Sequence, residues 1–420
     1  DRESKETCLL SDLRQRLSAS RTTVRVFKNR LKPLFEDPTQ FEGWKQDHTT
    51  ITIEKTAVDA YSGTICFLGI DSGSTTTKIT MIGESNELLF SWYRNNHGNP
   101  VNTVIEGLRE VKALLDEKRP DLTIAKSAVT GYGEDLIKAA FGIDKGMVET
   151  IAHYTAAKYV SPDVSFILDI GGQDMKAIFV ENGVINRIEL NEACSSGCGS
   201  FIETFGNSLD YPVSEFAELA CHAEAPCDLG TRCTVFMNSK VKQSLRENAS
   251  VEEISAGLAY SVIKNCLFKV LKLTSMDELG DHVVLQGGTF KNPSVIRAME
   301  LLSGKDVKCT DIPELMGAYG AALIARQEYE TVHRASSFIG LDMLDSVQNY
   351  KTRQVLCKGC ENLCSVTRFT FDNKASFFSG NKCEKFFTNR GEVKKQGNNL
   401  FEYKQQLLLE RDESALERPV

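Results

Sequence analysis

The chain has 420 residues, of which 41% are hydrophobic and 25% are charged, and this composition excludes a wholly disordered protein. Its 49 Lys and Arg residues stand against 57 Asp and Glu residues, and the net charge of −8 argues against non-specific nucleic-acid binding as its main activity. No apolar run is long enough to cross a membrane. Residues 1–6 contain neither Met nor an apolar signal core, so we expect a cytoplasmic piece of a longer chain.

The first part of the chain, residues 1–62, carries no motif with a chemical role. Residues 11–35 are compatible with a helix, and we expect Pro33 and Pro38 to end it because proline interrupts helical hydrogen bonding. We therefore expect a connector or the end of an upstream module.

A strand that ends in an acid opens the next part of the chain. Residues 65–71 are apolar up to Asp71, and a turn of Gly, Ser and Thr residues then leads into a strand at 78–82. Further elements follow in chain order: a strand at 88–94, a helix at 104–115 and a strand at 124–130.

A second copy of this pattern lies about 100 residues further on. A strand from residue 166 ends in Asp169, and a glycine turn leads into a strand at 175–180 and an Asn182-Gly183 hairpin turn. A third glycine turn covers residues 286–289. The repeat predicts two related α/β halves with a nucleotide between them.

These turns suit a polyphosphate. Glycine lets the backbone approach, the N–H and hydroxyl groups donate to phosphate oxygens, and the carboxylate can hold hydrated Mg²⁺. The sequence lacks both the Gly-Lys-Ser/Thr run of a Walker loop and a G-x-G-x-x-G fingerprint. An ordinary capped hairpin would explain one copy, but two copies with a third turn favour a nucleotide site.

The order of these motifs resembles the BadF/BadG/BcrA/BcrD ATPase family over roughly residues 64–328. The resemblance rests on five segments: 68–78, 168–174, 191–201, 233–241 and 286–288. Family members include activators of 2-hydroxyacyl-CoA dehydratases and ATPase subunits of benzoyl-CoA reductase. The resemblance implies the actin/Hsp70/sugar-kinase fold, in which two ribonuclease-H-like halves surround a nucleotide cleft.

The resemblance also implies roles for single residues. Asp71 and Asp169 would orient Mg²⁺ and its waters, and Gln173 would position the attacking water. The ATP-binding residues would be Gly73, Ser74, Thr75, Thr76, Lys78, Gly171, Gly172, Gly287 and Gly288, with the last two at the adenosine.

An iron–sulfur site follows from the same resemblance. Family members are homodimers that share one [4Fe-4S] cluster, and Cys194 is the expected ligand. Ala152 stands where the activators carry a second cysteine, so we expect Cys198 in that role, with Cys227 and Cys233 as alternatives. A cysteine before a helix N-terminus is favoured as thiolate. Cys198 can instead be a small buried residue.

Four more cysteines form a separate group in the tail. The spacing Cys-x₂-Cys-x₃-Cys-x₁₈-Cys suits Zn²⁺ or a second [4Fe-4S] cluster, and its members are Cys357, Cys360, Cys364 and Cys383. Residues 366–371 and 375–379 are expected to form a hairpin between them. A purely structural metal site remains the alternative to an electron-transfer role.

We therefore expect four segments: a connector at 1–62, a two-lobed ATPase domain at 63–330, a small Cys-rich element at 331–390 and a helical linker to a further domain at 391–420. The expected function is an ATP-hydrolysing electron donor that takes electrons from reduced ferredoxin or flavodoxin. The acceptor would be a metalloenzyme such as an acyl-CoA dehydratase or a double-cubane-type reductase, on another chain or on the same polypeptide. The alternatives are a sugar or metabolite kinase of the same fold and a zinc-containing nucleotide switch.

Overall fold

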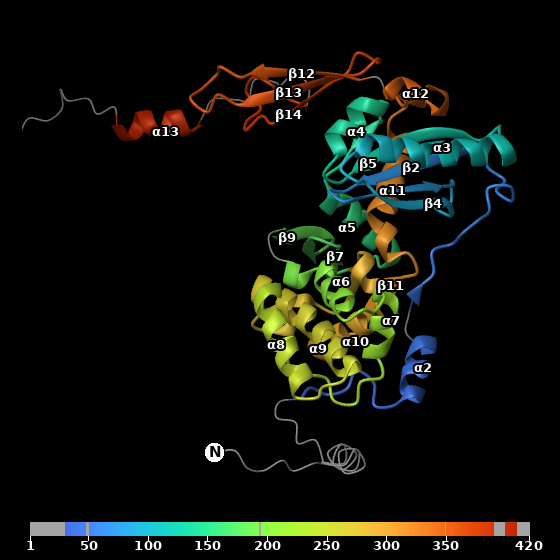
Figure 1. Cartoon of the computed structure of the whole chain (residues 1–420). Coiled ribbons are helices and arrows are strands. Elements are labelled where there is room, and N and C mark those ends of the chain that lie inside the picture. Colours follow the sequence, from blue (N-terminus) through green and yellow to red (C-terminus); the bar gives the residue numbers. More distant parts are fainter. Residues whose placement is uncertain (1–29, 48–49, 193–194, 349, 390–399, 410–420) are drawn as a thin grey trace, which may run out of the picture. The chain divides into compact units, whose positions relative to one another are not determined.

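The computed structural model describes residues 30–47, 50–192, 195–348, 350–389 and 400–409 (Figure 1). The chain divides into two units, of which unit 1 comprises residues 1–51 and 163–314 and unit 2 comprises residues 52–162 and 315–420. Each unit has its own mixed sheet and hydrophobic core, which confirms the prediction of two α/β halves. No helix in the described ranges is both long and apolar enough to cross a membrane.

The main sheet of unit 2 has five strands in the order β4-β3-β2-β5-β6. Their bounds are β2 (Ile65–Ser72), β3 (Thr76–Ile82), β4 (Leu88–Asn95), β5 (Thr123–Thr130) and β6 (Lys145–Gly146). Strands β2, β3 and β4 are antiparallel neighbours, whereas β5 runs parallel to β2 and β6 parallel to β5.

The sheet of unit 1 repeats this plan with the order β9-β8-β7-β10-β11-β1. Its strands are β1 (Thr50–Ile51), β7 (Phe166–Ile170), β8 (Met175–Glu181), β9 (Val184–Asn191), β10 (Val283–Gln286) and β11 (Val307–Thr310). Strands β7, β8 and β9 are antiparallel, and β10, β11 and β1 continue in parallel. The two sheets therefore confirm the internal repeat.

Each unit has its own set of helices. Unit 2 contains α3 (Pro100–Lys118), α4 (Glu134–Phe141), α5 (Glu149–Val160), α11 (Met316–Thr331) and α12 (Leu344–Val347). Unit 1 contains α2 (Pro38–Asp47), α6 (Gly199–Ser208), α7 (Val213–Ala220), α8 (Thr234–Arg246), α9 (Val251–Lys264) and α10 (Pro293–Ser303). In α3, the Asn99 side chain caps the N-terminus and apolar residues at helical spacing lie in the core.

The region expected to be a connector is packed into both units. Pro38 begins α2 instead of ending a helix, because the first helical turn needs no N–H donor at that position. Leu34, Phe35 and Phe41 lie in the core of unit 1, while Tyr61 lies in the core of unit 2. Residues 30–47 and 50–62 are thus structural parts of the two units. The remainder of this region lies outside the described residues.

The tail forms a separate sheet of three antiparallel strands, β12 (Lys351–Leu356), β13 (Ser365–Thr370) and β14 (Ser376–Ser379). This confirms the expected hairpin. Phe371 is buried in the core of unit 2, and the Asn373 side chain donates to the carbonyl oxygen of Ala139 over 2.9 Å. The last described element is α13 (Leu400–Leu409), within the expected helical linker.

Candidate functional site

The first candidate phosphate turn centres on Asp71 at the end of β2. Its Oδ2 accepts a hydrogen bond from Lys78 Nζ over 2.9 Å, and the two residues are cross-strand partners in β2 and β3. Asp71 Oδ1 and Ser72 Oγ are buried and have no hydrogen-bond partner among the described residues. Since buried polar atoms are normally satisfied, these two indicate a place for a ligand or its hydrated cation.

A glycine that directly follows the neighbouring strand β5 leaves space beside this buried carboxylate. Gly131 follows β5 with φ +90°, and a Cβ there would come within 2.7 Å of Asp71 Oδ1. Only glycine combines this backbone conformation with so close an approach.

Asn96 holds the first candidate turn in place through hydrogen bonds, although its sequence context did not point to this role. Its side chain donates to Gly73 O over 2.8 Å and accepts from Thr77 Oγ1 over 2.6 Å. Its backbone N–H donates to Thr75 O over 2.7 Å. Ser74 is exposed and Thr75 is half-buried, so both can reach a ligand. Asn96 stands in the polar run 95–99, where no local pattern distinguishes it from its neighbours.

The second candidate turn repeats this arrangement in unit 1. Asp169 is buried at the end of β7, and Lys176 Nζ lies 3.7 Å from its Oδ2. Lys176 also pairs with Asp174. Gly287 follows β10 with φ +93°, and a Cβ there would come within 2.6 Å of Asp169 Oδ1. Gly287 is thus the structural counterpart of Gly131.

Each unit therefore gathers its own part of the predicted residue set. Unit 2 holds the group Asp71, Gly73, Ser74, Thr75, Thr76 and Lys78, and unit 1 holds the group Asp169, Gly171, Gly172, Gln173, Gly287 and Gly288. Gly172, Gln173 and Gly288 are exposed, whereas Gly287 is buried against the aspartate.

Helix α6 attaches directly to the second turn. The backbone N–H groups of Gly199 and Ser200 donate to the carbonyl oxygens of Gly171 (2.9 Å) and Gly172 (2.8 Å). Thr289 Oγ1 also donates to Gly171 O, over 3.2 Å. The first N–H groups of a helix have no partner within the helix, so here the turn supplies their acceptors.

The cysteines near α6 differ in their surroundings. Cys194 lies outside the described residues. Cys198 is fully buried in the core of unit 1, close to Cys266, whose thiol pKa is raised first by burial and then by Cys198. Cys227 is also buried, and Arg30 donates to its Sγ. Cys233 is partly exposed and occupies the N-cap position of α8, where its side chain makes no capping hydrogen bond. The packing of Cys198 fits the alternative of a small buried residue.

A buried amide joins the loop after Cys194 to the start of α8. Asn265 begins a π-helical turn (Asn265–Val270), and its Nδ2 donates to Ser196 O (3.0 Å) and Arg232 O (3.4 Å). The hydroxyls of Ser195 and Thr234 lie 2.7 Å apart. Cys227 and Cys233 are the two alternatives to Cys198 as second ligand. Of these, Cys233 is the one next to a residue, Thr234, that contacts the loop after Cys194.

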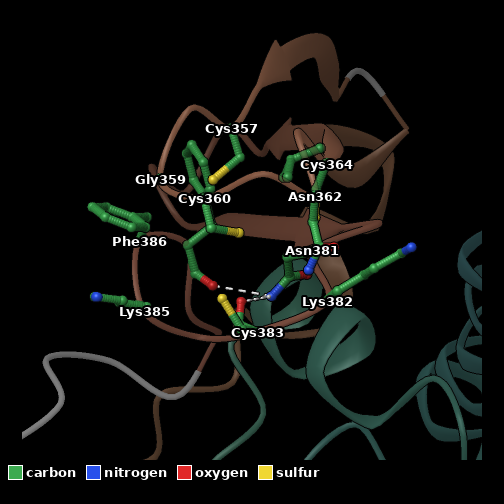
Figure 2. A pocket seen from close by; sticks show the side chains of 12 residues that line it. Cys357, Gly359, Cys360, Asn362, Cys364, Asn381, Lys382, Cys383, Lys385 and Phe386 are labelled. Atoms are coloured by element: carbon green, nitrogen blue, oxygen red, sulfur yellow. Dashed lines mark hydrogen bonds between the residues drawn. The ribbon is translucent and has the colours of Figure 1, made fainter.

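The four tail cysteines line one pocket (Figure 2). The backbone N–H of Cys357 donates to Cys364 O over 2.8 Å, and the Asn381 side chain donates to Cys383 O over 3.2 Å. Within the described ranges no three cysteine sulfurs lie within 4.8 Å of one another. A zinc tetrahedron with Zn–S bonds of about 2.3 Å needs sulfurs about 3.8 Å apart. The four cysteines therefore line one pocket, but their sulfur atoms are further apart than in such a tetrahedron.

Comparison with known proteins decides the family. Residues 68–325 match the sequence model of the BadF/BadG/BcrA/BcrD ATPase family. The chain belongs to this family. The tail pocket formed by residues 357–387 lies beyond the matched region.

Similar proteins include two activators of acyl-CoA dehydratases and one subunit of an acyl-CoA reductase. The activating ATPase of (R)-2-hydroxyglutaryl-CoA dehydratase from Acidaminococcus fermentans is 32% identical over 61% of this chain and 96% of its own length. The 2-hydroxyisocaproyl-CoA dehydratase activator of Clostridioides difficile is 31% identical over 62% and 95%, respectively. One of the subunits of benzoyl-CoA reductase from Thauera aromatica is 27% identical over 49% and 73%.

Solved structures of the family agree with the fold. Component A of the A. fermentans dehydratase superposes with a TM-score of 0.55 at 30% identity, over 64% of this chain and 100% of that chain. The activator from Clostridium difficile with bound ADPNP gives a TM-score of 0.55 at 30% identity, over 63% and 96%. The chain has the α/β fold of the actin/Hsp70/sugar-kinase type, as the resemblance implied.

Proposed function

We propose that this chain is an ATP-hydrolysing iron–sulfur electron donor that activates a partner metalloenzyme. The support comes from relatives that activate acyl-CoA dehydratases or form part of benzoyl-CoA reductase. Reduced ferredoxin or flavodoxin would supply the electron. The acceptor would be an acyl-CoA dehydratase or a double-cubane-type reductase.

The two buried aspartates are the proposed ligands of hydrated Mg²⁺ on ATP. Each has a lysine on the adjacent antiparallel strand, with Lys78 Nζ 2.9 Å from Asp71 Oδ2 and Lys176 Nζ 3.7 Å from Asp169 Oδ2. Exposed hydroxyl and amide groups of the two turns would donate to the phosphates. Gln173 is exposed in its turn and would orient the attacking water.

The hydrogen bonds from α6 to the second phosphate turn are the observation that carries the proposed coupling. The helix begins five residues after Cys194 and takes two carbonyl groups of the turn as acceptors for its first N–H groups. A change in the turn on ATP hydrolysis would therefore move the start of α6. Coupling between the two sites requires such an element with different contacts in the two nucleotide states.

A [4Fe-4S] cluster, when bound, supplies one-electron transfer at low potential. In the proposed homodimer, Cys194 of each protomer provides one thiolate. The second would come from Cys198 or from Cys233, and the greater exposure of Cys233 together with its position at the start of α8 favours it. The tail group Cys357, Cys360, Cys364 and Cys383 would hold Zn²⁺ or a second cluster.

Anaerobic purification with iron, sulfide and zinc analysis tests the proposal. A shared cluster predicts about two irons per chain, and a tail cluster raises this to about six. Cys194→Ser and Cys233→Ser should each abolish the visible iron–sulfur absorption, whereas Cys309→Ser, a buried thiol elsewhere in unit 1, should not. If Cys198→Ser removes iron and Cys233→Ser does not, the second ligand is Cys198.

Nucleotide chemistry is tested separately. Asp71→Asn and Asp169→Asn should each lower the rate of ATP hydrolysis by at least about 100-fold while iron content stays constant. Absence of iron in a protein that phosphorylates a hydroxylated metabolite would establish the kinase alternative. Zinc without iron in a protein that binds ATP would favour the nucleotide switch.

A further inference from the structure

The tail element at residues 351–389 is basic, although the chain as a whole is acidic. It carries seven Lys and Arg residues against three Asp and Glu residues, a net charge of +4 in a chain whose net charge is −8. None of the seven cations forms an ion pair with a residue that the structure describes. A divalent metal held by four thiolates would remove about two of these charges and leave the element positive. The tail therefore presents positive charge for which the described chain provides no counterion.

Strand register gathers part of this charge on one face of the tail sheet. Arg353 in β12 is the direct cross-strand partner of Arg368 in β13, and Lys351 lies two residues from Arg353 on the same face. These three exposed residues form the basic face. The strands β12, β13 and β14 contain no acidic residue. Like charges directly opposite each other destabilise a sheet, and an anionic partner would offset this cost.

The opposite face of the tail sheet is occupied by the protein itself. Phe369 and Phe377 are cross-strand partners there, and both pack against the core of unit 2. On the basic face, the guanidinium of Arg368 lies over the Phe378 ring at 5.8 Å and donates to Ser376 Oγ over 3.1 Å. Because successive side chains of a strand alternate between its faces, the basic face is directed away from the core of unit 2.

The basic face continues into the cysteine pocket of the tail. Val366 lies two residues before Arg368, so it is on the same face of β13 and about 7 Å away, and it lines the pocket together with the four tail cysteines. Lys382 and Lys385 are exposed at the rim of this pocket, and Figure 2 shows them extending away from the cysteines. The cations of the sheet and of the rim therefore belong to one surface.

An exposed aromatic ring lies beside the same cysteines. Phe386 is 57% exposed, although its ring packs so closely on Gly359 that a Cβ there would clash with it. Gly359 stands between Cys357 and Cys360 in the sequence. The ring is thus fixed in place without being buried. Aromatic anchors with a polar and charged surround are typical of protein interfaces, so this surface suits a protein partner.

We propose that the basic face and the pocket rim form the docking site of a small acidic electron-carrier protein. The inference rests on the proposed function, in which such a carrier is the electron donor. Electron-transfer encounters are steered by charge and usually bury less than about 1,200 Å², so a small element such as the tail sheet is sufficient. A nucleic acid is disfavoured because it would extend beyond the tail over a chain that is acidic elsewhere. The site lies beyond the family-matched residues 68–325 and is an addition to the family domain.

Association kinetics with an acidic ferredoxin as the probe test the docking site. The anaerobically purified full chain should bind oxidised ferredoxin with a rate constant that falls at least about tenfold between about 0.03 and 0.3 M salt. Arg353→Glu should lower this rate constant about tenfold at low salt. Lys118→Glu reverses an exposed charge in the last turn of α3, outside the tail, and should change it less than about twofold.

Thermal unfolding separates a docking defect from a folding defect. Arg353→Glu places a carboxylate opposite Arg368, so the midpoint of unfolding should not fall while ferredoxin binding weakens. Equal association rates in the wild type and Arg353→Glu would overturn the inference, and normal iron content with ATP hydrolysis would leave the proposed function standing. Arg353-dependent binding of a short single-stranded oligonucleotide, without binding of ferredoxin, would replace the inference with a nucleic-acid site. An iron-free chain that binds neither ATP nor ferredoxin would overturn both the inference and the proposed function.

Discussion

The backbone N–H of Gly199 donates a hydrogen bond to the carbonyl oxygen of Gly171 over 2.9 Å. Gly171 belongs to the second candidate phosphate turn, and Gly199 begins α6, the helix that follows the cysteine loop. A Cβ on Gly199 would approach Gly171 O to 3.2 Å and Thr289 Oγ1 to 2.5 Å, so the contact depends on a small residue. The second candidate phosphate turn and the first turn of α6 thus share hydrogen bonds within one unit.

Gly287→Ala should abolish ATP binding. The residue has φ +93°, and its new Cβ would meet the Ile170 carbonyl and approach Asp169 Oδ1 to 2.6 Å. With ψ 153° this backbone lies in a region essentially confined to glycine, which costs any other residue about 1–3 kcal/mol, and the clash displaces the turn. Gly304→Ala is the matched control because it has φ +66° and open space around it. Titration calorimetry should show loss of ATP binding only in the first variant, and equal affinities would contradict the assigned role.

Asn96→Ala should destabilise the first candidate phosphate turn. The change removes the donor to Gly73 O and leaves Thr77 Oγ1 without its acceptor inside the protein. We expect a loss of about 1–3 kcal/mol in the free energy of unfolding and a weaker ATP affinity. Asn99→Ala removes only the cap of α3, so its cost of about 1 kcal/mol should leave the affinity unchanged. Chemical denaturation measures the free energy of unfolding, and calorimetry measures the ATP affinity. An unaltered ATP affinity in Asn96→Ala would show that ATP binding does not depend on the hydrogen bonds of Asn96.

Acid stability should depend on Asp144. Burial raises the pKa of this carboxyl, but hydrogen bonds from Ser336, Ser337, Ser127 and Lys126 outweigh it, and the pKa in the folded protein lies below the usual value. Its contribution is therefore present above the ordinary pKa of about 4 and is lost as the pH falls through the lower folded pKa.

Denaturation from neutral pH to pH 2 checks this sign. Asp144→Asn should lower the free energy of unfolding by about 2 kcal/mol at neutral pH and reduce its fall towards acid pH. Asp281→Asn, which alters a carboxylate on the surface, should leave the neutral-pH stability nearly unchanged. A variant curve that runs parallel to the wild type throughout would contradict the assignment.

Alkylation should separate two classes of cysteine. Burial raises the pKa of Cys66, Cys221 and Cys309 to about 12, so little thiolate is available for attack at pH 8. Cys360 and Cys383 are exposed. In metal-free protein, iodoacetamide and peptide mass spectrometry should label the latter pair within minutes and the former only after unfolding. Added Zn²⁺ or a reconstituted cluster should protect Cys360 and Cys383 from alkylation. Equal labelling of these two cysteines with and without metal would argue against a metal site in the tail.

The local pattern of the sequence determined much of the fold. An apolar run that ends in Asp and a glycine–hydroxyl turn predicted the two hairpins around Asp71 and Asp169, because strand and turn preferences depend on neighbouring residues. The Asn182-Gly183 turn was equally local, since both residues adopt positive φ. The tail hairpin followed from the same kind of signal.

The tertiary structure decided what distant segments bring together. The sequence favoured Cys198 and left Cys233 as an alternative, yet the Cys198 thiol is enclosed by the core, whereas Cys233 is partly exposed at the N-cap position of α8. Asn96 and Asn265 act through partners 23 and 69 residues away, and Trp44 meets Glu300 across 256 residues. Burial and side-chain hydrogen bonding depend on which segments lie next to each other in space, and no short stretch of sequence contains that information.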